Sequence, residues 1–263
     1  MCGRYSLTTP VEGLRQLFDF PEQPNLKPRY NIAPTQEVAA VRSAPPAGAT
    51  QGAAGPGQGD ADEGGAGEGG ARRHLVLLRW GLIPSWAKDP SIGARMINAR
   101  AETLAEKPAF RSAFRKRRCL VAADGFYEWQ KRGTGPKQPY RIAARNGGPF
   151  AFAGLWERWR NPAEGHDVES CTIVTTGANA LLSPIHNRMP VILAPENYDL
   201  WLDPEAELDR VQNLLAGGPG VDLMASAIST RVNKVANDDP EVLIPLAGAP
   251  DSEADRSGQA KLL

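Results

Sequence analysis

The chain has 263 residues, of which 41% are hydrophobic and 23% charged, and its formal net charge at neutral pH is zero. This length suits one domain, and no apolar run approaches the roughly 18–20 residues that a membrane span needs. The first residues are charged where a secretory signal would be apolar, so we expect a cytoplasmic protein with no membrane partner. The three cysteines, Cys2, Cys119 and Cys171, lie far apart, which excludes a disulfide framework and paired zinc ligands. We expect reduced thiols, no metal site and no cofactor.

The balanced charge argues at first against a nucleic-acid partner, because phosphate binding usually shows as a basic excess. Many acidic residues, however, gather in two low-complexity segments, residues 43–73 and the tail 247–263. Both segments hold too few apolar side chains to offset the entropy of ordering, so we expect both to be flexible. The remaining chain, residues 1–246, is then one domain with 43–73 as an internal insertion.

The first predicted element is a helix that follows Thr9. Thr9 is a favourable N-cap, Pro10 suits the first helical position, and Glu12 completes a capping box. This helix should end near Pro21. Beyond the insertion, the apolar residues 75–78 predict a short strand.

The middle of the chain predicts a helix followed by several strands. Residues 107–118 are typical of a helix, and residues 119–123 and 126–130 predict two strands joined as a hairpin by Asp124-Gly125. Further strands are expected at 140–143 and 150–155, which should pair, and at 171–176 and 190–193, with a helix at 205–215 and apolar runs at 223–228 and 242–246. Strands without regular βαβ alternation predict the α+β class with a mainly antiparallel sheet.

Cys2 carries the most specific chemical signal. Removal of Met1 would leave a residue whose α-amine, with a reference pKa of about 7.7–8.0, and thiol, with one of about 8.5, are both partly nucleophilic at neutral pH. An aldehyde that meets this 1,2-aminothiol forms an imine with the amine, and the thiol then closes a five-membered thiazolidine. The alternative is an incidental cysteine near a frayed terminus.

Two further residues are candidate proton carriers. Glu128 lies among aromatic residues in the segment 126–129, where partial burial would raise its pKa and suit it to acid–base catalysis. The alternative is a surface carboxylate that points outward from a strand.

His186 lies in a loop between Pro184 and Pro190, which would hold the imidazole in place as a proton shuttle. A structural histidine bonded to the backbone is equally consistent with this loop.

Several polar and aromatic residues suggest binding of an extended polymer. Arg4 could hold a phosphate through two parallel hydrogen bonds, and Asn98 and Arg100 would share one face of an extended segment. Asn98 could instead cap the helix that follows it. The loops 29–35 and 80–86 combine proline with aromatic residues, which either stack on unpaired bases or pack within the fold.

Six ordered motifs together resemble the SOS response-associated peptidase family, also called abasic site processing proteins. The motifs are Met1-Cys2-Gly3-Arg4-Tyr5, Arg29-Tyr30-Asn31-Ile32-Ala33-Pro34, Trp80-Gly81-Leu82-Ile83-Pro84-Ser85-Trp86, Ile97-Asn98-Ala99-Arg100-Ala101-Glu102, Ala123-Asp124-Gly125-Phe126-Tyr127-Glu128-Trp129 and Ile185-His186-Asn187-Arg188-Met189-Pro190. The resemblance covers residues 1–42 and 75–246. The long insertion after Arg42 is unusual for the family.

The resemblance implies a single domain with a distorted, barrel-like antiparallel sheet core, peripheral helices and a positively charged cleft for single-stranded DNA. The family's catalytic residues fall on Cys2, Asn98, Glu128 and His186. Its DNA-binding residues fall on Arg4, Arg100 and Arg188 for phosphates and on Thr175 for a hydroxyl contact.

The resemblance also implies a DNA-repair protein that senses abasic sites in single-stranded DNA and forms a covalent thiazolidine crosslink through Cys2 once Met1 has left. Weak lyase activity would follow from the imine intermediate, and the peptidase activity in the family name would be the self-removal of Met1. A monomer is expected. Two rivals stay open: an N-terminal-nucleophile cysteine amidohydrolase, and a DNA-binding module in which Cys2 is only structural.

Overall fold

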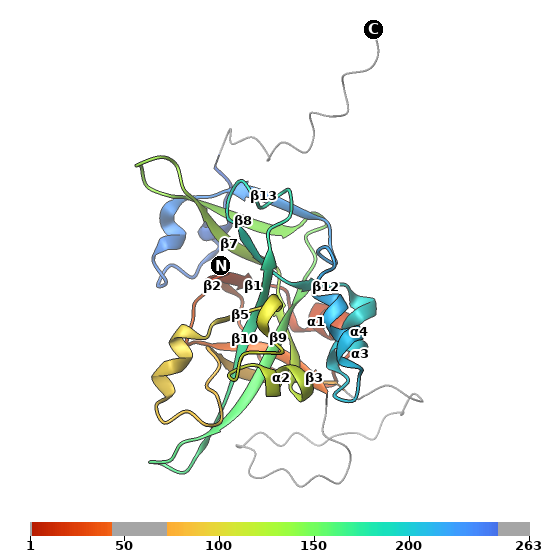
Figure 1. The fold of residues 1–263 in the computed structure, drawn as a ribbon. Coiled ribbons are helices and arrows are strands. Elements are labelled where there is room, and N and C mark those ends of the chain that lie inside the picture. The colour runs from red at the N-terminus through yellow and green to blue at the C-terminus, as the bar shows by residue number, and fades with distance from the viewer. Residues whose placement is uncertain (1, 44–72, 247–263) are drawn as a thin grey trace.

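The computed structural model describes residues 2–43 and 73–246, and a closed barrel of five strands forms its centre (Figure 1). In order round the barrel, the strands are β3 (Glu37–Ser43), β4 (Arg73–Trp80), β10 (Asp167–Gly177), β9 (Phe150–Arg160) and β6 (Arg118–Ala123). Within this ring only the short β4–β10 ladder is parallel. The predicted α+β class and the mainly antiparallel, barrel-like core are confirmed.

Three short strands extend the barrel wall. They are β5 (Asn98–Arg100), β11 (Arg188–Pro190) and β12 (Ile192–Leu193). Both β5 and β11 pair with the same end of β10, where Thr175 lies opposite Arg100 of β5 and also pairs with β11 on its other side. Residues from three separate parts of the chain therefore meet at Thr175.

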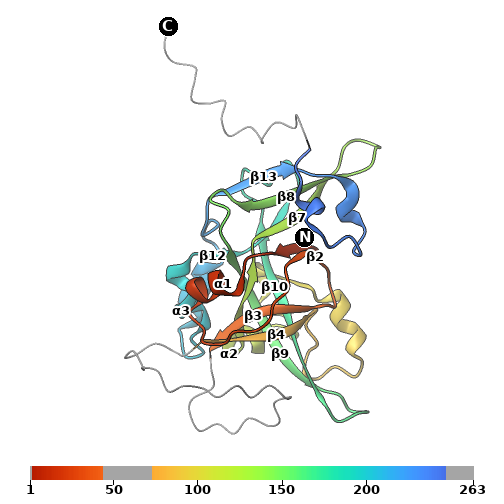
Figure 2. The ribbon, with the colours of Figure 1, turned by 180° about the vertical axis from the view of Figure 1, so that it is seen from behind.

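A second, antiparallel sheet contains the N-terminal strand. Its order is β13 (Leu223–Ala227), β8 (Gln138–Ala144), β7 (Gly125–Gln130), β1 (Tyr5–Leu7) and β2 (Arg29–Ile32). Figures 1 and 2 show β13, β8 and β7 toward one end of the molecule and β1 and β2 next to the barrel. β1 is an inner strand, hydrogen-bonded to β2 on one side and to β7 on the other. The start of the described chain is therefore enclosed by its neighbours.

Aromatic packing joins β1 to the barrel. The ring of Tyr5 lies edge-on to those of Trp80 and Phe152, with centroids 5.3 and 5.7 Å away. All three side chains are completely buried. Buried aromatic pairs in this geometry stabilise a fold by about 0.5–1.5 kcal/mol beyond their buried area. Tyr5 therefore fixes the strand that follows Cys2.

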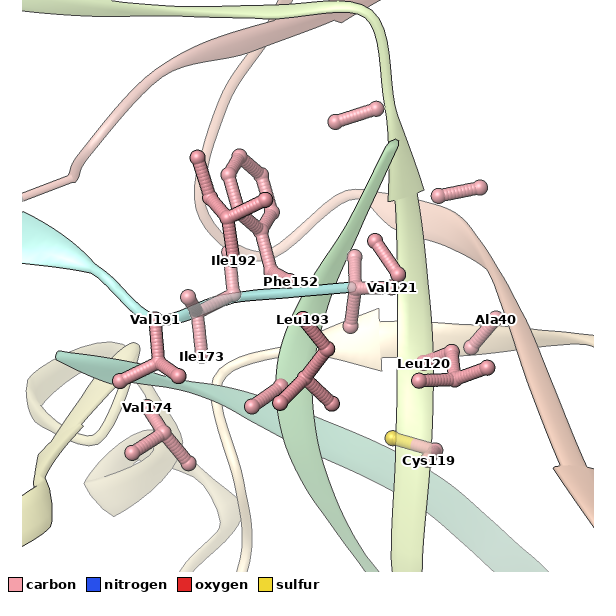
Figure 3. Close-up of a cluster of buried hydrophobic side chains, with 14 of the residues drawn as sticks. Ala40, Cys119, Leu120, Val121, Phe152, Ile173, Val174, Val191, Ile192 and Leu193 are labelled. Atoms are coloured by element: carbon pink, nitrogen blue, oxygen red, sulfur yellow. The ribbon is translucent and has the colours of Figure 1, made fainter. Parts of the chain in front are cut away.

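The barrel interior is filled by apolar side chains. Figure 3 shows Val121, Phe152 and Ile173, from β6, β9 and β10, together with Ile192 of β12. Each of these residues is at most 2% exposed. The inside of the barrel is therefore a packed core.

Short helices surround the barrel. The α-helices of the described residues are α1 (Val11–Phe18), α2 (Arg111–Lys116), α3 (Tyr198–Leu202) and α4 (Leu208–Leu214), and the 3-10 turns are η1 (Pro90–Arg95), η2 (Ala101–Thr103), η3 (Pro195–Asn197), η4 (Thr230–Asn233) and η5 (Pro240–Leu243). Figures 1 and 2 both place α1 and α3 on the same side of the barrel. Across the described ranges, none of the helices has the length and apolar composition of a membrane span.

The predicted hairpin at Asp124-Gly125 is wrong. The strands on either side, β6 and β7, belong to different sheets. The buried Asp124 carboxylate accepts hydrogen bonds from Ser6 Oγ at 2.6 Å, from Thr9 N–H at 3.0 Å and from both the N–H and the hydroxyl of Thr8. Asp124 therefore ties the end of β1 to the junction between the sheets.

The predicted cap of the first helix is also wrong. The N-cap of α1 is Pro10, which makes no side-chain hydrogen bond. The Thr9 hydroxyl instead donates to Asp124 at 3.3 Å.

The predicted pairing of 140–143 with 150–155 is also wrong. β8 pairs with β7 and β13, whereas β9 pairs with β6, β10 and β12.

Other predicted elements differ in extent. The helices predicted at 107–118 and 205–215 are shorter in the structure, as α2 and α4, and the strand predicted at 171–176 is part of the longer β10. The predicted run 190–193 is divided between β11 and β12, and the predicted run 242–246 begins within η5. Residues 44–72 and 247–263, predicted to be flexible, lie outside the described residues. Ser43 and Arg73, at the limits of the predicted insertion, instead pair with each other in the β3–β4 ladder.

Candidate active site

Cys2 lies just before β1 and is completely buried. The strand is anchored there by a hydrogen bond of 3.0 Å from Tyr127 N–H to Arg4 O. The interpretation of Cys2 as part of a frayed terminus is therefore wrong. Burial raises the pKa of the Cys2 thiol, and the charge of Glu128 raises it further. The thiol is therefore protonated at neutral pH, unlike the partly ionised thiol expected from reference values.

Asn98 reaches Cys2 from the barrel. Its Nδ2 donates a hydrogen bond of 2.8 Å to the Cys2 carbonyl. The Oδ1 atom of the same amide is buried and accepts no hydrogen bond from the described residues. Asn98 does not cap the turn that follows, because the N-cap of η2 is Arg100. The amide therefore orients the Cys2 backbone and keeps one acceptor available.

Glu128 lies on β7, the strand beside β1, and is 2% exposed. Burial raises the pKa of its carboxyl, and the nearby His186 acts in the opposite direction. Tyr127, the residue before Glu128, donates its N–H to Arg4 O, two residues after Cys2, and the charge of Glu128 contributes to the raised pKa of the Cys2 thiol. The alternative prediction, a surface carboxylate that points outward from the strand, is therefore wrong. The buried Glu128 can donate or accept a proton beside Cys2.

His186 is held by its own loop. Its backbone N–H donates to Leu182 O at 2.8 Å, and its Nδ1 accepts from Arg188 N–H at 3.0 Å. The same Nδ1 lies 3.3 Å from Arg188 O, so this ring nitrogen faces both the N–H and the carbonyl of Arg188, and the tautomer decides which of the two it bonds. The residue thus has the backbone bond of a structural histidine and also lies close enough to Glu128 to influence its pKa.

Arg188 and Thr175 contact each other directly. Arg188 Nη2 donates to Thr175 O at 2.6 Å and to Thr175 Oγ1 at 3.2 Å, and the guanidinium also pairs with Glu102. Thr175 is completely buried, whereas Arg100, opposite it on β5, is exposed. The Thr175 hydroxyl therefore lies beneath Arg188, and the two arginines lie nearer the surface.

Arg4 turns toward the C-terminal part of the domain. Its Nη1 donates to Asn31 Oδ1 at 2.8 Å and to Val232 O at 2.9 Å, and its Nη2 donates to Asn233 O at 3.2 Å. These bonds fix the guanidinium beside β1 and link it to η4. Arg4 thus anchors the segment that follows Cys2, in addition to any contact with a ligand.

Asn31 and Asp238 complete this anchor and were given no role by the sequence. Asn31 is completely buried and its Nδ2 lies 2.9–3.1 Å from the carbonyls of Val232, Lys234 and Asn237. The Asp238 carboxylate accepts from Asn31 N–H at 2.9 Å. Asn31 stood in a recognisable motif, but its partners lie about 200 residues away, where no local signal marks them.

The proline-aromatic loop 80–86 holds one buried and one exposed tryptophan. Trp80 is completely buried, and its Nε1 donates to Ile97 O at 2.9 Å, so it is a packing residue. Trp86, in the same motif, is 59% exposed.

Beside Arg4, an open pocket of about 560 Å³ is lined by Ser229, Thr230, Arg231, Asn233, Lys234 and Asn237. Within residues 2–43 and 73–246, no group of His, Cys, Asp and Glu side chains is arranged to hold a metal ion.

The family model described as SOS response associated peptidase (SRAP) matches residues 1–235. Abasic site processing protein YoqW from Bacillus subtilis (strain 168) is 39% identical over 247 residues, which cover 92% of this chain and 99% of that protein. Abasic site processing protein HMCES from Gallus gallus is 37% identical over 199 residues, which cover 67% of this chain and 59% of that protein.

The fold has a close counterpart among solved structures. A crystal structure of a protein from Bacteroides thetaiotaomicron superposes with a TM-score of 0.76 at 25% identity and covers 93% of this chain and 100% of that one. The family match extends over the buried cysteine, its asparagine and glutamate neighbours, and the histidine loop. The chain therefore belongs to the SOS response associated peptidase family.

Proposed function

We propose that the chain is a DNA-repair protein that senses abasic sites in single-stranded DNA and becomes covalently linked to them through Cys2. The observation that carries the proposal is the position of the buried Cys2 directly before the enclosed strand β1, where Asn98 of β5 bonds its carbonyl and Glu128 comes from the neighbouring strand β7. Relatives named abasic site processing proteins support the same substrate. Removal of Met1 is part of the proposal, because only then does Cys2 carry the free α-amine.

The DNA strand binds through its phosphates, which position it without reading its sequence. Arg100 and Arg188 supply the cations on the β10 side, and Thr175 acts by holding Arg188. Arg4 anchors the segment between Cys2 and β1 and has further N–H groups for a phosphate. An abasic sugar lacks a base, so it can approach the buried Cys2 where a normal nucleotide is too large.

The reaction begins at the α-amine of Cys2. The ring-opened sugar presents an aldehyde, with His186 assisting proton transfer during ring opening. The amine adds to C1′ to give a carbinolamine, and the Glu128 carboxyl protonates the departing hydroxyl so that water leaves and an imine forms. The raised pKa of Glu128 favours this acid form.

Ring closure then uses the thiol. The Glu128 carboxylate takes the thiol proton, the sulfur adds to the imine carbon, and the nitrogen is protonated, which yields a thiazolidine with one water released overall. The raised pKa of the Cys2 thiol implies that this deprotonation needs a base, and Glu128 is close enough to influence that pKa. In this scheme the amine adds first and the thiol closes the ring.

Asn98 contacts both Cys2 and the abasic sugar in this scheme. Its Nδ2 holds the Cys2 carbonyl at 2.8 Å, and its buried Oδ1, which has no partner among the described residues, can accept a hydrogen bond from a sugar hydroxyl. Weak lyase activity follows where the imine eliminates the 3′ phosphate before the thiol closes the ring. Peptidase activity is proposed only as self-removal of Met1.

The test mixes the mature protein with a single-stranded oligonucleotide that contains one abasic site. We expect a heat-stable adduct for the wild type and none for Cys2→Ala. Because the alanine variant retains an α-amine, borohydride should still trap an imine with it. Full heat-stable crosslinking by Cys2→Ala would overturn the proposal.

The same samples separate the rival functions. Glutamine hydrolysis in the absence of DNA would favour an N-terminal-nucleophile amidohydrolase. Salt-sensitive binding of the oligonucleotide without any adduct, even after borohydride, would favour a DNA-binding module with a structural Cys2.

A further inference from the structure

Glu102, in η2 directly after β5, pairs with Arg188 of β11 through both carboxylate oxygens. Oε1 accepts from Nη1 at 2.5 Å and Oε2 accepts from Nη2 at 3.0 Å. Two parallel N–H···O bonds are also the arrangement by which a guanidinium binds two oxygens of a phosphate. The Glu102 carboxylate therefore has the contacts that a phosphate bound to Arg188 would have.

Arg188 does not depend on Glu102 for its orientation. Its Nη2 is also held by the carbonyl and hydroxyl oxygens of Thr175, which is completely buried in β10 and paired with β5 and β11. The side chain of Glu102 is 53% exposed, whereas that of Arg188 is 15% exposed. Glu102 therefore covers a cation that the sheet itself holds in place.

A second arginine acts on the same carboxylate. The hydrogen bond from Arg188 is the largest cause that lowers the pKa of Glu102, and the charges of Arg188 and Arg100 lower it further. Glu102 is therefore negatively charged at neutral pH. Its charge lies beside the two arginines proposed to bind phosphates on the β10 side.

We infer that Glu102 is a specificity-determining residue that occupies the place of a DNA phosphate on Arg188 and so weakens the binding of undamaged single strands. The inference rests on the proposed function and deepens it. A phosphate that reaches Arg188 must break the Glu102 pair and approach the released carboxylate, so non-covalent binding gains little from this cation. The protein then stays on DNA chiefly where Cys2 reacts.

The test compares the affinities of wild type, Glu102→Gln and Glu106→Gln for an undamaged single-stranded oligonucleotide by fluorescence anisotropy. Glu106 is a matched control, because it is exposed, lies four residues away and forms no ion pair with any described residue. We expect about fivefold tighter binding for Glu102→Gln, which corresponds to about 1 kcal/mol. For Glu106→Gln we expect a change of less than about twofold.

Two further measurements connect the effect to Arg188. The gain from Glu102→Gln should disappear in an Arg188→Gln background, because the two side chains act as a pair. The slope of log affinity against log salt should become steeper by about 0.7 in Glu102→Gln, the amount for one additional phosphate contact on a single strand.

The outcomes separate the inference from the function on which it rests. Unchanged or weaker binding by Glu102→Gln, an equal gain in Glu106→Gln, or a gain that persists without Arg188 would overturn the role of Glu102 and leave the crosslinking proposal standing. If the wild type binds no single-stranded DNA at low salt and forms no adduct with abasic DNA, the proposed function fails and the inference falls with it.

Discussion

At Glu128, burial has consequences for both catalysis and stability. Burial raises the pKa of this carboxyl above that of the unfolded chain. Between the two pKa values the folded state binds more protons than the unfolded state, so stability falls as pH rises through this window and is level above it. Ionisation of the buried Glu128 carboxyl therefore lowers the free energy of unfolding.

Glu128→Gln should remove this cost. We expect the free energy of unfolding of the variant at about pH 8 to equal or exceed that of the wild type, and its decline above about pH 4.3, the reference value for Glu, to become shallower. Chemical denaturation at several pH values measures both quantities. A variant that is clearly less stable than the wild type at high pH would contradict this account of the carboxyl.

The same substitution should slow the reaction. Loss of a general acid–base group typically lowers a rate by about 10²–10⁴-fold, so we expect crosslinking by Glu128→Gln to be slower by at least about 10²-fold while DNA binding is retained. Single-turnover crosslinking at saturating protein measures the rate, with Glu106→Gln as the control for loss of a surface carboxylate. An unchanged rate would remove Glu128 from the proton-transfer role.

Asn98 can be tested with a matched pair of variants. Asn98→Ala loses both the bond to the Cys2 carbonyl and the Oδ1 acceptor, whereas Asn98→Asp keeps an acceptor but loses the donor. We expect about 1 kcal/mol less stability for the alanine variant. Crosslinking should be slower in both, because each lets the Cys2 backbone move. Wild-type crosslinking by Asn98→Asp would show that the donor is dispensable.

At the level of elements, β1 is the strand on which the site depends. It is held between β2 and β7, and at its end by the Asp124 carboxylate, which accepts hydrogen bonds from Ser6, Thr8 and Thr9. A carboxylate can accept all of these bonds at once because it has only acceptors. An amide of the same shape cannot.

Asp124→Asn should therefore loosen β1. Hydrogen bonds to a charged group contribute about 1.5–3 kcal/mol each, so we expect a loss of at least about 2 kcal/mol in the free energy of unfolding. Crosslinking should slow as well. Asp209→Asn in the exposed first turn of α4 is the control, with an expected change below about 1 kcal/mol, the contribution of one acidic residue near a helix N-terminus. Equal effects of the two substitutions would refute the anchoring role of Asp124.

Local patterns predicted strands better than strand partners. The strands predicted at 119–123 and 126–130 are present as β6 and β7, each beginning one residue earlier. Their predicted pairing is wrong although Asp124-Gly125 favours a tight turn in isolation. In the structure the Asp124 carboxylate accepts a hydrogen bond from Ser6 of β1, more than 100 residues away, and β6 and β7 belong to different sheets. The Thr9 cap failed for the same reason, since Asp124 competes for its hydroxyl.

At the level of the whole molecule, the site combines residues that the sequence could identify with supports that it could not. Cys2 and Glu128 were marked by their chemistry and by the family motifs, and the structure pairs β7, the strand of Glu128, with β1, the strand that follows Cys2. The anchor formed by Asn31 and Asp238 spans about 200 residues, so no periodicity or motif could reveal it. Glu102 stood in a motif, but its role depends on a partner, Arg188, in another strand.

The position of Cys2 also limits how the protein can be extended. An N-terminal extension that prevents Met1 removal leaves every side chain in place but converts the α-amine of Cys2 into an amide, which cannot form an imine. We expect such a protein to bind single-stranded DNA and to give no adduct. Protease cleavage that exposes Cys2 should restore crosslinking. An adduct formed by the uncleaved protein would contradict the aminothiol mechanism.

Covalent linkage of DNA through the N-terminal cysteine is tested most directly by the mass of the crosslinked peptide. The wild-type protein is reacted with abasic single-stranded DNA, denatured and digested, and the DNA-bearing peptide is identified by mass spectrometry. We expect the peptide that begins at Cys2, without Met1, joined to the abasic sugar with the loss of one water. DNA on any other peptide, or on a peptide that still begins with Met1, would contradict it.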